Sequence, residues 1–143
     1  MTVVAWDGTT LAADRRTTCG GLIRETTKIW RIGKLLVGGA GELGTVCSLR
    51  DWVAGGCDPE RAPKYDAEPD AELLVIHPDG ATYRYYAGVT PFRCESRAKA
   101  IGSGAPYAVT AMHLGRSAEE AVHIASELHN GCGNGVDTLR IEA

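Results

Sequence analysis

Residues 2–18, TVVAWDGTTLAADRRTT, contain the features that decide the fold. Thr2 to Trp6 is a β-branched and apolar start that is typical of a strand. Asp7-Gly8 is a hairpin signal, and Thr10 to Ala13 predict a second strand that runs back beside the first. The chain is therefore expected to begin with an antiparallel hairpin whose second strand returns residues 12–18 alongside the first.

The following segments continue this pattern as an antiparallel meander. Gly20-Gly21 predicts a turn, and residues 26–32 and 34–37 predict two short strands around Gly33. The glycine-rich run 38–41 is expected to end the sheet. From residue 42 the apolar period becomes helical and continues to residue 53, where Gly55-Gly56 follows as a stop.

The second half of the chain alternates between the same two kinds of element. Residues 57–71 predict a loop, 72–77 and 81–86 predict strands, and one short strand is expected near residue 98. Pro106 predicts a helix that ends at Gly115, and the capping box Ser117-x-x-Glu120 predicts another that ends at Gly131. With a final strand over 136–141, the order predicts an α+β fold of layered helices and antiparallel sheets.

Composition limits the classes of function. The 143 residues suit one domain, residues 1–143, and 15 basic against 18 acidic side chains give a net charge of −3. That balance argues against nucleic acid or an anionic membrane as partner. Because no window approaches the ~20 apolar residues that span a bilayer and the start of the chain is polar, we expect a soluble, cytoplasmic protein. The five scattered cysteines predict reduced thiols, and the histidines share no metal-ligand spacing, so neither a metal nor a cofactor is expected.

Thr2 is a candidate nucleophile. Removal of Met1 would leave Thr2 with a free α-amine beside its own hydroxyl, and such an amine titrates near pH ~8. The amine can therefore take the proton of the hydroxyl and activate it for attack. Many proteins begin with Met-Thr, so this reading depends on the residues that follow.

An ordered set of short motifs supplies that support. Asp14-Arg15-Arg16-Thr17-Thr18 is followed by Lys28-Ile29-Trp30-Arg31, then by Ala40-Gly41 before the first expected helix, and late in the chain by Gly102-Ser103-Gly104. In this order and spacing, most of the chain resembles the proteasome β-subunit and HslV family of N-terminal nucleophile (Ntn) hydrolases. The resemblance implies a four-layer αββα sandwich, and the chain looks like a short, divergent member.

The resemblance also implies a set of catalytic roles. Thr2 would be the nucleophile, Lys28 would favour its alkoxide, and Asp14 would hold Lys28 in place. The Gly41 amide would stabilise the oxyanion, and Ser103 would hydrogen-bond near the Thr2 amine. Substrate-binding positions would flank the cleft and line its specificity pocket, which Gly39 is expected to make roomy: Arg16, Thr18, Thr26, Gly39, Leu43 and Cys47.

Two positions depart from the family pattern. Where the family has an Asp and, three residues later, a Ser followed by Gly, this chain has His129 and Cys132-Gly133. A one-residue shift that places Asn130 at the Asp position is an alternative. Residues 57–71 also replace a second long helix of the family, so the form of any ring is open.

The implied activity is threonine-type hydrolysis of a peptide or unfolded protein. By the same resemblance, we expect a homo-oligomer and an ATPase unfoldase as a partner, since the chain has no ATP-binding motif of its own. Three alternatives remain: a non-catalytic subunit or scaffold of the same fold, an Ntn amidase that acts on a small amide, and an unrelated α+β binding module.

Overall fold

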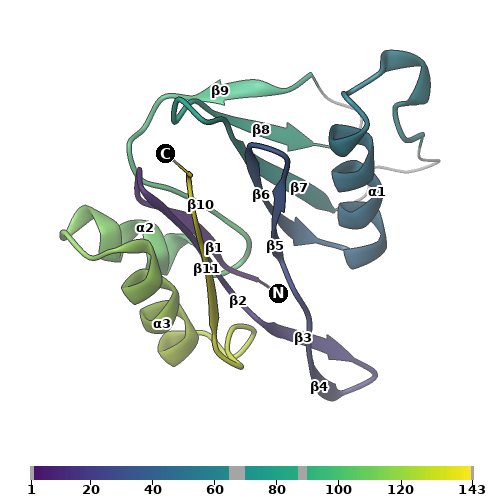
Figure 1. Cartoon of the computed structure of the whole chain (residues 1–143). Coiled ribbons are helices and arrows are strands. Elements are labelled where there is room, and N and C mark those ends of the chain that lie inside the picture. The colour runs from purple at the N-terminus through teal and green to yellow at the C-terminus, as the bar shows by residue number, and fades with distance from the viewer. Residues whose placement is uncertain (1, 65–69, 87–89, 143) are drawn as a thin grey trace.

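The computed structural model describes residues 2–64, 70–86 and 90–142. Figure 1 shows two sheets between helices, with α2 and α3 on one side of the molecule and α1 on the other. The helices are α1 (Leu43–Ala54), α2 (Ala105–His113) and α3 (Ala118–Leu128), and a 3-10 turn covers Pro59–Arg61. The strands are β1 (Val4–Trp6), β2 (Thr10–Asp14), β3 (Arg16–Cys19), β4 (Leu22–Glu25), β5 (Ile29–Ile32), β6 (Leu35–Gly41), β7 (Ala71–Ile76), β8 (Thr82–Tyr86), β9 (Phe92–Cys94), β10 (Lys99–Ile101) and β11 (Val136–Arg140).

The two large sheets are antiparallel and pack face to face. The first has the order β10-β1-β2-β11, and the second has the order β5-β6-β7-β8-β9. Apolar side chains fill the space between them, among them Trp6 and Leu11 from the first sheet and Leu36 and Leu74 from the second. The outer face of the first sheet packs on α2 and α3, and that of the second packs on α1. The predicted αββα sandwich is therefore confirmed.

The N-terminal hairpin forms as expected, and it fixes the register of the site. Val4 pairs with Ala13 and Trp6 pairs with Leu11 across β1 and β2. In the next part of the chain, β3 and β4 form a separate two-stranded hairpin around the predicted Gly20-Gly21 turn. The sequence placed residues 16–18 on the second strand, whereas the structure ends β2 at Asp14 and begins β3 at Arg16. Strand β4 was not predicted, because it is exposed and lacks an alternating apolar pattern.

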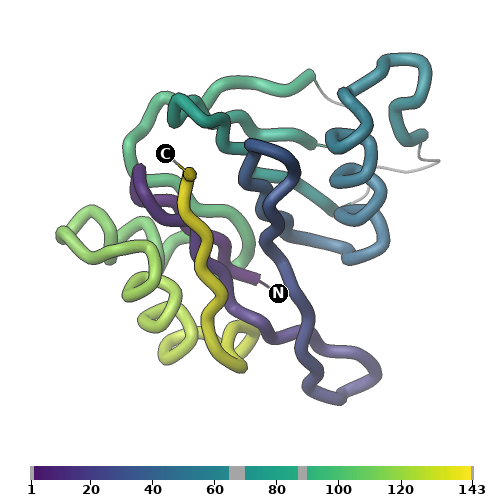
Figure 2. The backbone as a smooth tube through the Cα atoms, viewed as in Figure 1, coloured from purple at the N-terminus to yellow at the C-terminus, as the bar shows by residue number. Residues whose placement is uncertain are grey.

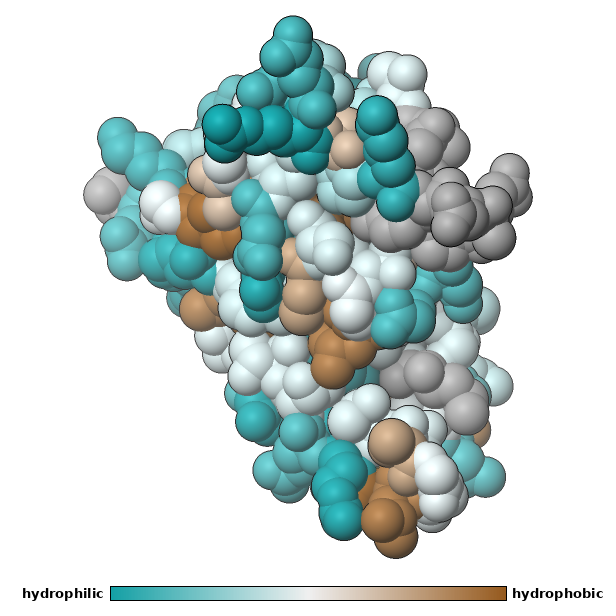
Figure 3. Space-filling view, turned by 90° about the vertical axis from the view of Figure 1, so that its right-hand side faces the viewer, coloured by the Kyte–Doolittle hydropathy of each residue, from teal (hydrophilic) through white to brown (hydrophobic). Residues whose placement is uncertain are grey.

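The β3–β4 hairpin extends away from the sandwich, as the tube in Figure 2 shows at the lower right. Leu22 and Ile23 on β4 are 54% and 51% exposed. Figure 3 shows a brown group of apolar side chains at the lower end of the molecule, where Figure 1 places this hairpin.

The prediction that residues 38–41 end the sheet was wrong. Strand β6 continues through Gly41 and pairs with β7 along this run. A Cβ on Gly38 would lie 2.5 Å from Val4 Cγ1, and one on Gly39 would lie 2.2 Å from Val46 Cγ1. These glycines therefore allow close packing of the strand between the other sheet and α1, and they do not mark a turn.

The helix boundaries follow the predicted signals with small shifts. Glu42 caps α1 by accepting hydrogen bonds from the amides of Gly44 and Thr45, and Gly55 is the C-terminal cap. The Ser117–Glu120 capping box is present at the start of α3. The loop predicted for residues 57–71 contains the 3-10 turn, gives way to β7 at Ala71, and includes residues 65–69, which lie outside the described residues.

Within the described ranges, the helices all fall short of the length and apolar character that crossing a membrane requires.

Candidate active site

Thr2 lies just before β1 and is held from two directions by the Gly102-Ser103-Gly104 loop. The Thr2 nitrogen donates a hydrogen bond to Ser103 Oγ at 3.2 Å, and the Thr2 carbonyl accepts one from the Gly104 amide at 3.0 Å. Gly102 has φ +93°, and a Cβ there would lie 2.2 Å from the Thr2 carbonyl oxygen. Glycine is therefore required at this position both by conformation and by space.

Asp14 is the last residue of β2, and both oxygens of its fully buried carboxylate accept hydrogen bonds. Oδ1 accepts the Val3 amide at 3.1 Å and the Lys28 ammonium at 2.9 Å. Oδ2 accepts the amides of Arg16 and Gly133 at 3.2 and 3.1 Å. A buried carboxylate is stable only when it is paired and hydrogen-bonded in this way, so Asp14 fixes the position of the lysine.

Lys28 precedes β5 and is 4% exposed. Its Nζ donates to Asp14 Oδ1 and, at 2.5 Å, to the Arg16 carbonyl oxygen, while its own carbonyl accepts the Gly39 amide at 2.9 Å. Burial lowers the pKa of the Lys28 ammonium below its ordinary value, and the hydrogen bond and charge of Asp14 oppose this only in part. The ammonium is therefore a buried positive charge with a weakened hold on its proton.

A small cavity of about 30 Å³, called here the Thr2 cavity, is lined by both Thr2 and Lys28. Gly41 closes one side with φ +115°, and a Cβ there would lie 2.0 Å from the Asp70 carbonyl oxygen, so only glycine fits. The roomy pocket expected from Gly39 is not found, because Val46 and Trp30 occupy the space beside that glycine. The lining consists of Thr2, Thr17, Thr26, Lys28, Trp30, Gly39, Gly41, Leu43 and Val46.

Most of the predicted site residues meet at this place. Thr2, Lys28, Gly41, Thr26, Gly39 and Leu43 line the cavity, and Asp14 and Ser103 contact its members. Thr18 is exposed on β3, and Cys47 is half-buried on α1. Neither is among the lining residues that the structure describes, so their contact with substrate stays a prediction.

The Arg16 side chain binds the loop after α3, and its predicted contact with substrate stays a prediction. Its guanidinium donates to Asn134 Oδ1 and to the Asn130 carbonyl oxygen, both at 2.8 Å. The same loop supplies the Gly133 amide that binds Asp14. The side chain of Arg16 therefore holds the loop after α3 against the buried Asp14–Lys28 pair.

Three lining residues were missed by sequence reasoning, and two had a usable signal. Trp30 lies two residues after Lys28, and alternate strand residues share a face. Val46 lies three residues after Leu43, which places the two on one side of a helix. Thr17 had no such signal, because it lies between Arg16 and Thr18, the two β3 residues that the resemblance assigned to substrate binding.

The two departures from the family pattern lie at the site itself. His129 Nε2 is 3.0 Å from Ser103 Oγ, and the imidazole packs at 6.0 Å between ring centroids on Tyr107. It is therefore His129, and not Asn130, that contacts Ser103. Cys132 is 1% exposed, and burial, helped by the Asp14 charge, raises the pKa of its thiol to about 11. The thiol is thus a neutral group at neutral pH.

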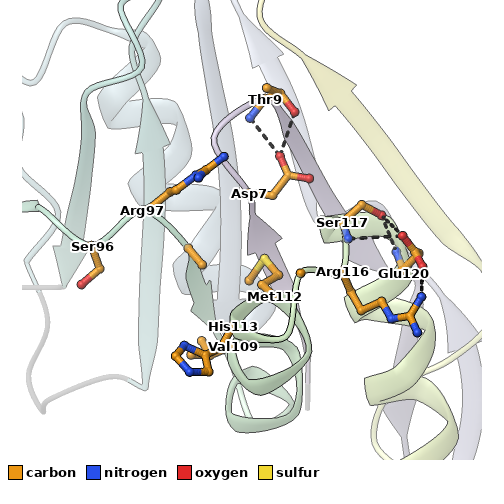
Figure 4. Close-up of a pocket in the computed structure, with 12 residues that line it drawn as sticks. Asp7, Thr9, Ser96, Arg97, Val109, Met112, His113, Arg116, Ser117 and Glu120 are labelled. Carbon is orange, nitrogen blue, oxygen red and sulfur yellow. Dashed lines mark hydrogen bonds and ion pairs between the residues drawn. The ribbon is translucent and has the colours of Figure 1, made fainter.

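A second and much larger opening, called here the large hollow, has a volume of about 790 Å³. Figure 4 shows its lining, which comes from the β1–β2 turn, the residues before β10, the end of α2 and the start of α3. Among its charged side chains, Arg116 lies 3.3 Å from Glu120 at the surface.

In the part of the chain that the structure describes, no three His, Cys, Asp or Glu side chains form a group that could hold a metal ion.

Solved structures with the same architecture cover nearly the whole chain. BPH from Thiobacillus denitrificans in complex with epoxomicin is 24% identical, with a TM-score of 0.75 and full coverage of both chains. A second structure, of BPH from Thiobacillus denitrificans, is 24% identical at a TM-score of 0.73, with 99% of each chain covered. Eukaryotic HslV from Trypanosoma brucei is 21% identical at a TM-score of 0.75, with 99% of each chain covered.

Comparison by sequence gives a different result: no family model and no curated protein matches the chain. The likeness is thus one of structure, with full-length coverage and the same layers in the same order. The chain has the proteasome-like fold of the Ntn hydrolases, the fold of HslV.

Proposed function

We propose that this chain is a threonine-type peptidase whose nucleophile is Thr2, exposed as the N-terminal residue by removal of Met1. One observation carries the proposal: Thr2 and the buried Lys28 line the same small cavity, and Asp14 fixes the lysine from behind. A buried ammonium beside a hydroxyl favours the alkoxide form of that hydroxyl. Such an arrangement is costly to fold, and it has a clear use in nucleophilic catalysis.

The mechanism follows from these positions. The freed Thr2 amine takes the proton of the Thr2 hydroxyl, and the oxygen attacks the substrate carbonyl to form an ester while the C–N bond breaks. The proton held by the amine passes to the departing amine of the substrate. The Thr2 amine then activates a water, which hydrolyses the ester and restores the hydroxyl. Lys28 and the Gly41 amide stabilise the negative charge in both steps.

The proposed substrate is an extended peptide or unfolded protein. Thr18 on β3 would pair its backbone with such a peptide, as the resemblance implies. The cavity beside Thr2 has about 30 Å³ and is bounded by Trp30 and Val46, which favours a small side chain next to the cleaved bond. Peptides with alanine at that position should therefore react faster than those with phenylalanine.

We further propose assembly into a homo-oligomer in the cytoplasm, with an ATPase unfoldase that supplies unfolded chains. The support is the full-length structural likeness to HslV and BPH. Sedimentation of the purified protein tests the oligomer directly.

Hydrolysis of fluorogenic peptides tests the activity. The wild-type protein should release the fluorophore, and Thr2→Ala should lose at least ~10³-fold in kcat/KM, because the nucleophile is gone. Thr138→Ala, which changes an exposed threonine on β11, is the matched control and should keep full activity. Hydrolysis of small amides alone would indicate an amidase, and an inert wild-type protein would indicate a non-catalytic subunit.

A further inference from the structure

His129 is the residue at the site whose role the proposed mechanism leaves open. It is the C-terminal cap of α3, and its Nε2 lies 3.0 Å from Ser103 Oγ. Ser103 Oγ in turn accepts the hydrogen bond of the Thr2 nitrogen at 3.2 Å. One hydroxyl therefore connects the imidazole to the nitrogen that the mechanism uses as a base.

The direction of the Ser103 proton depends on the charge of the imidazole. A neutral His129 with its proton on Nδ1 accepts the Ser103 O–H at Nε2, which leaves the Ser103 lone pairs for N–H groups of Thr2. A protonated His129 donates to Ser103 Oγ instead, so the serine proton must turn elsewhere. In the chain that has lost Met1, the lone pair of the Thr2 amine is the acceptor beside it. Protonation thus occupies the base and adds a positive charge near it.

Histidine is the side chain that changes its charge between pH 5 and 8. The groups that surround this one are the Tyr107 ring from α2, the Ser103 hydroxyl, and the Cys132 amide, which donates to the His129 carbonyl at 3.0 Å. Arg16 from β3 binds the carbonyl of the next residue, Asn130. Among these described neighbours, Arg16 is the charged side chain, and it is a cation.

We propose that His129 acts through Ser103 as a positioning residue that switches the Thr2 base off when it is protonated. This inference rests on the proposed function, because it concerns the same base. It predicts that two groups, the Thr2 amine and His129, must both be free of an added proton for the site to work.

The pH dependence of kcat/KM for peptide hydrolysis distinguishes this role from a structural one, because it reports the titration of the free enzyme. At pH values low enough to protonate both groups, wild type should lose about 100-fold per pH unit, since two protons must leave, and His129→Gln should lose about tenfold. His123→Gln, an exposed histidine on the same helix, is the control and should behave as wild type. Equal slopes for wild type and His129→Gln would overturn the proposal.

A second measurement decides the matter even if no peptide is hydrolysed. With ¹⁵N labelling, the His129 ring should carry its proton on Nδ1 at high pH, and the Thr2 nitrogen signal should shift with the His129 titration. Ser103→Ala should abolish that shift. A proton on Nε2 at high pH, or a Thr2 signal that ignores His129, would contradict the relay, whereas an inactive protein with an intact relay would reject only the proposed peptidase.

Discussion

The large hollow and the Thr2 cavity differ both in volume and in the burial of their charged side chains, and the smaller site has the buried charges. The large hollow measures about 790 Å³ and the Thr2 cavity about 30 Å³. At the large hollow, the Arg116 and Glu120 side chains are 61% and 52% exposed, whereas the Lys28 and Asp14 side chains are 5% and 0% exposed. Water screens the first pair and not the second. Buried charge, and not volume, therefore marks the candidate active site.

The largest expected effect comes from breaking the buried pair. Asp14→Asn leaves the Lys28 ammonium without its carboxylate in a dry environment and should lower the free energy of unfolding by about 3–5 kcal/mol. Arg116→Met at the large hollow removes an exposed ion pair and should cost less than about 1 kcal/mol. Urea unfolding of both variants measures the difference, and equal losses would show that the two pairs are alike.

Two glycines with nearly the same backbone conformation, one beside Thr2 and one at the large hollow, should differ in how they tolerate a side chain. Gly102 has φ +93° and Gly115 has φ +92°, but a Cβ at Gly102 would overlap the Thr2 carbonyl, while one at Gly115 meets nothing within 4 Å. Gly115→Ala should therefore cost about 1 kcal/mol for conformation alone, and Gly102→Ala should cost about 2–4 kcal/mol. Thermal unfolding decides the point, and a Gly102 variant as stable as the Gly115 variant would mean that Thr2 is loosely held.

The large hollow has a structural carboxylate of its own, and its effect should be smaller. Asp7 binds the amides of Thr10 and Ala118 at 2.8 Å each. Burial raises the pKa of Asp7, but hydrogen bonds from Ala118, Thr10 and Thr9 outweigh it, so the pKa lies below its ordinary value of 3.8.

Asp7→Asn should therefore cost about 1 kcal/mol at pH 7 through loss of this cap at the start of α3. A carboxylate with a lowered folded pKa stabilises the protein above the unfolded value and loses that contribution as pH falls through the folded value. The gap in unfolding free energy between wild type and variant should thus shrink below pH 3.8. A free-energy gap that stays constant between pH 7 and pH 3 would show that the charge of the Asp7 carboxylate does not stabilise the fold.

The smallest change concerns a thiol near the buried pair. Because the pKa of Cys132 is raised to about 11 and the side chain is 1% exposed, it should resist alkylation at pH 7.5 in the folded protein. Cys19, which is exposed on the β3–β4 hairpin, should react at least about 100-fold faster. Peptide mapping after brief treatment with iodoacetamide compares the two, and early modification of Cys132 would show that the site opens readily.

Local signals predicted much of the fold. The Asp7-Gly8 turn and the Ser117–Glu120 capping box act within a few residues, so the sequence alone reveals them. The role of Gly38 could not be predicted, because it depends on contact with Val4 from the opposite sheet. Strand β4 and the separation of β3 from β2 were not predicted, because neither β3 nor β4 has a buried face to impose an alternating pattern.

The site was predictable only where a motif order could be matched. Thr2, Asp14 and Lys28 came from that order, and the structure places Thr2 and Lys28 on one cavity with Asp14 bound to the lysine. The contact between His129 and Ser103 joins residues 26 positions apart through the packing of α2 against α3. No periodicity or spacing encodes such a contact. The sequence therefore showed that His129 stands where the family has an Asp, but not that His129 contacts Ser103.

Covalent labelling tests whether Thr2 is an activated nucleophile. The purified protein is treated with a threonine-directed epoxyketone, and the modified residue is mapped by mass spectrometry. We expect a chain that has lost Met1 and carries one inhibitor on Thr2, and we expect no adduct on Thr2→Ala. An unlabelled wild-type protein that retains Met1, or an adduct on another residue, would contradict this expectation.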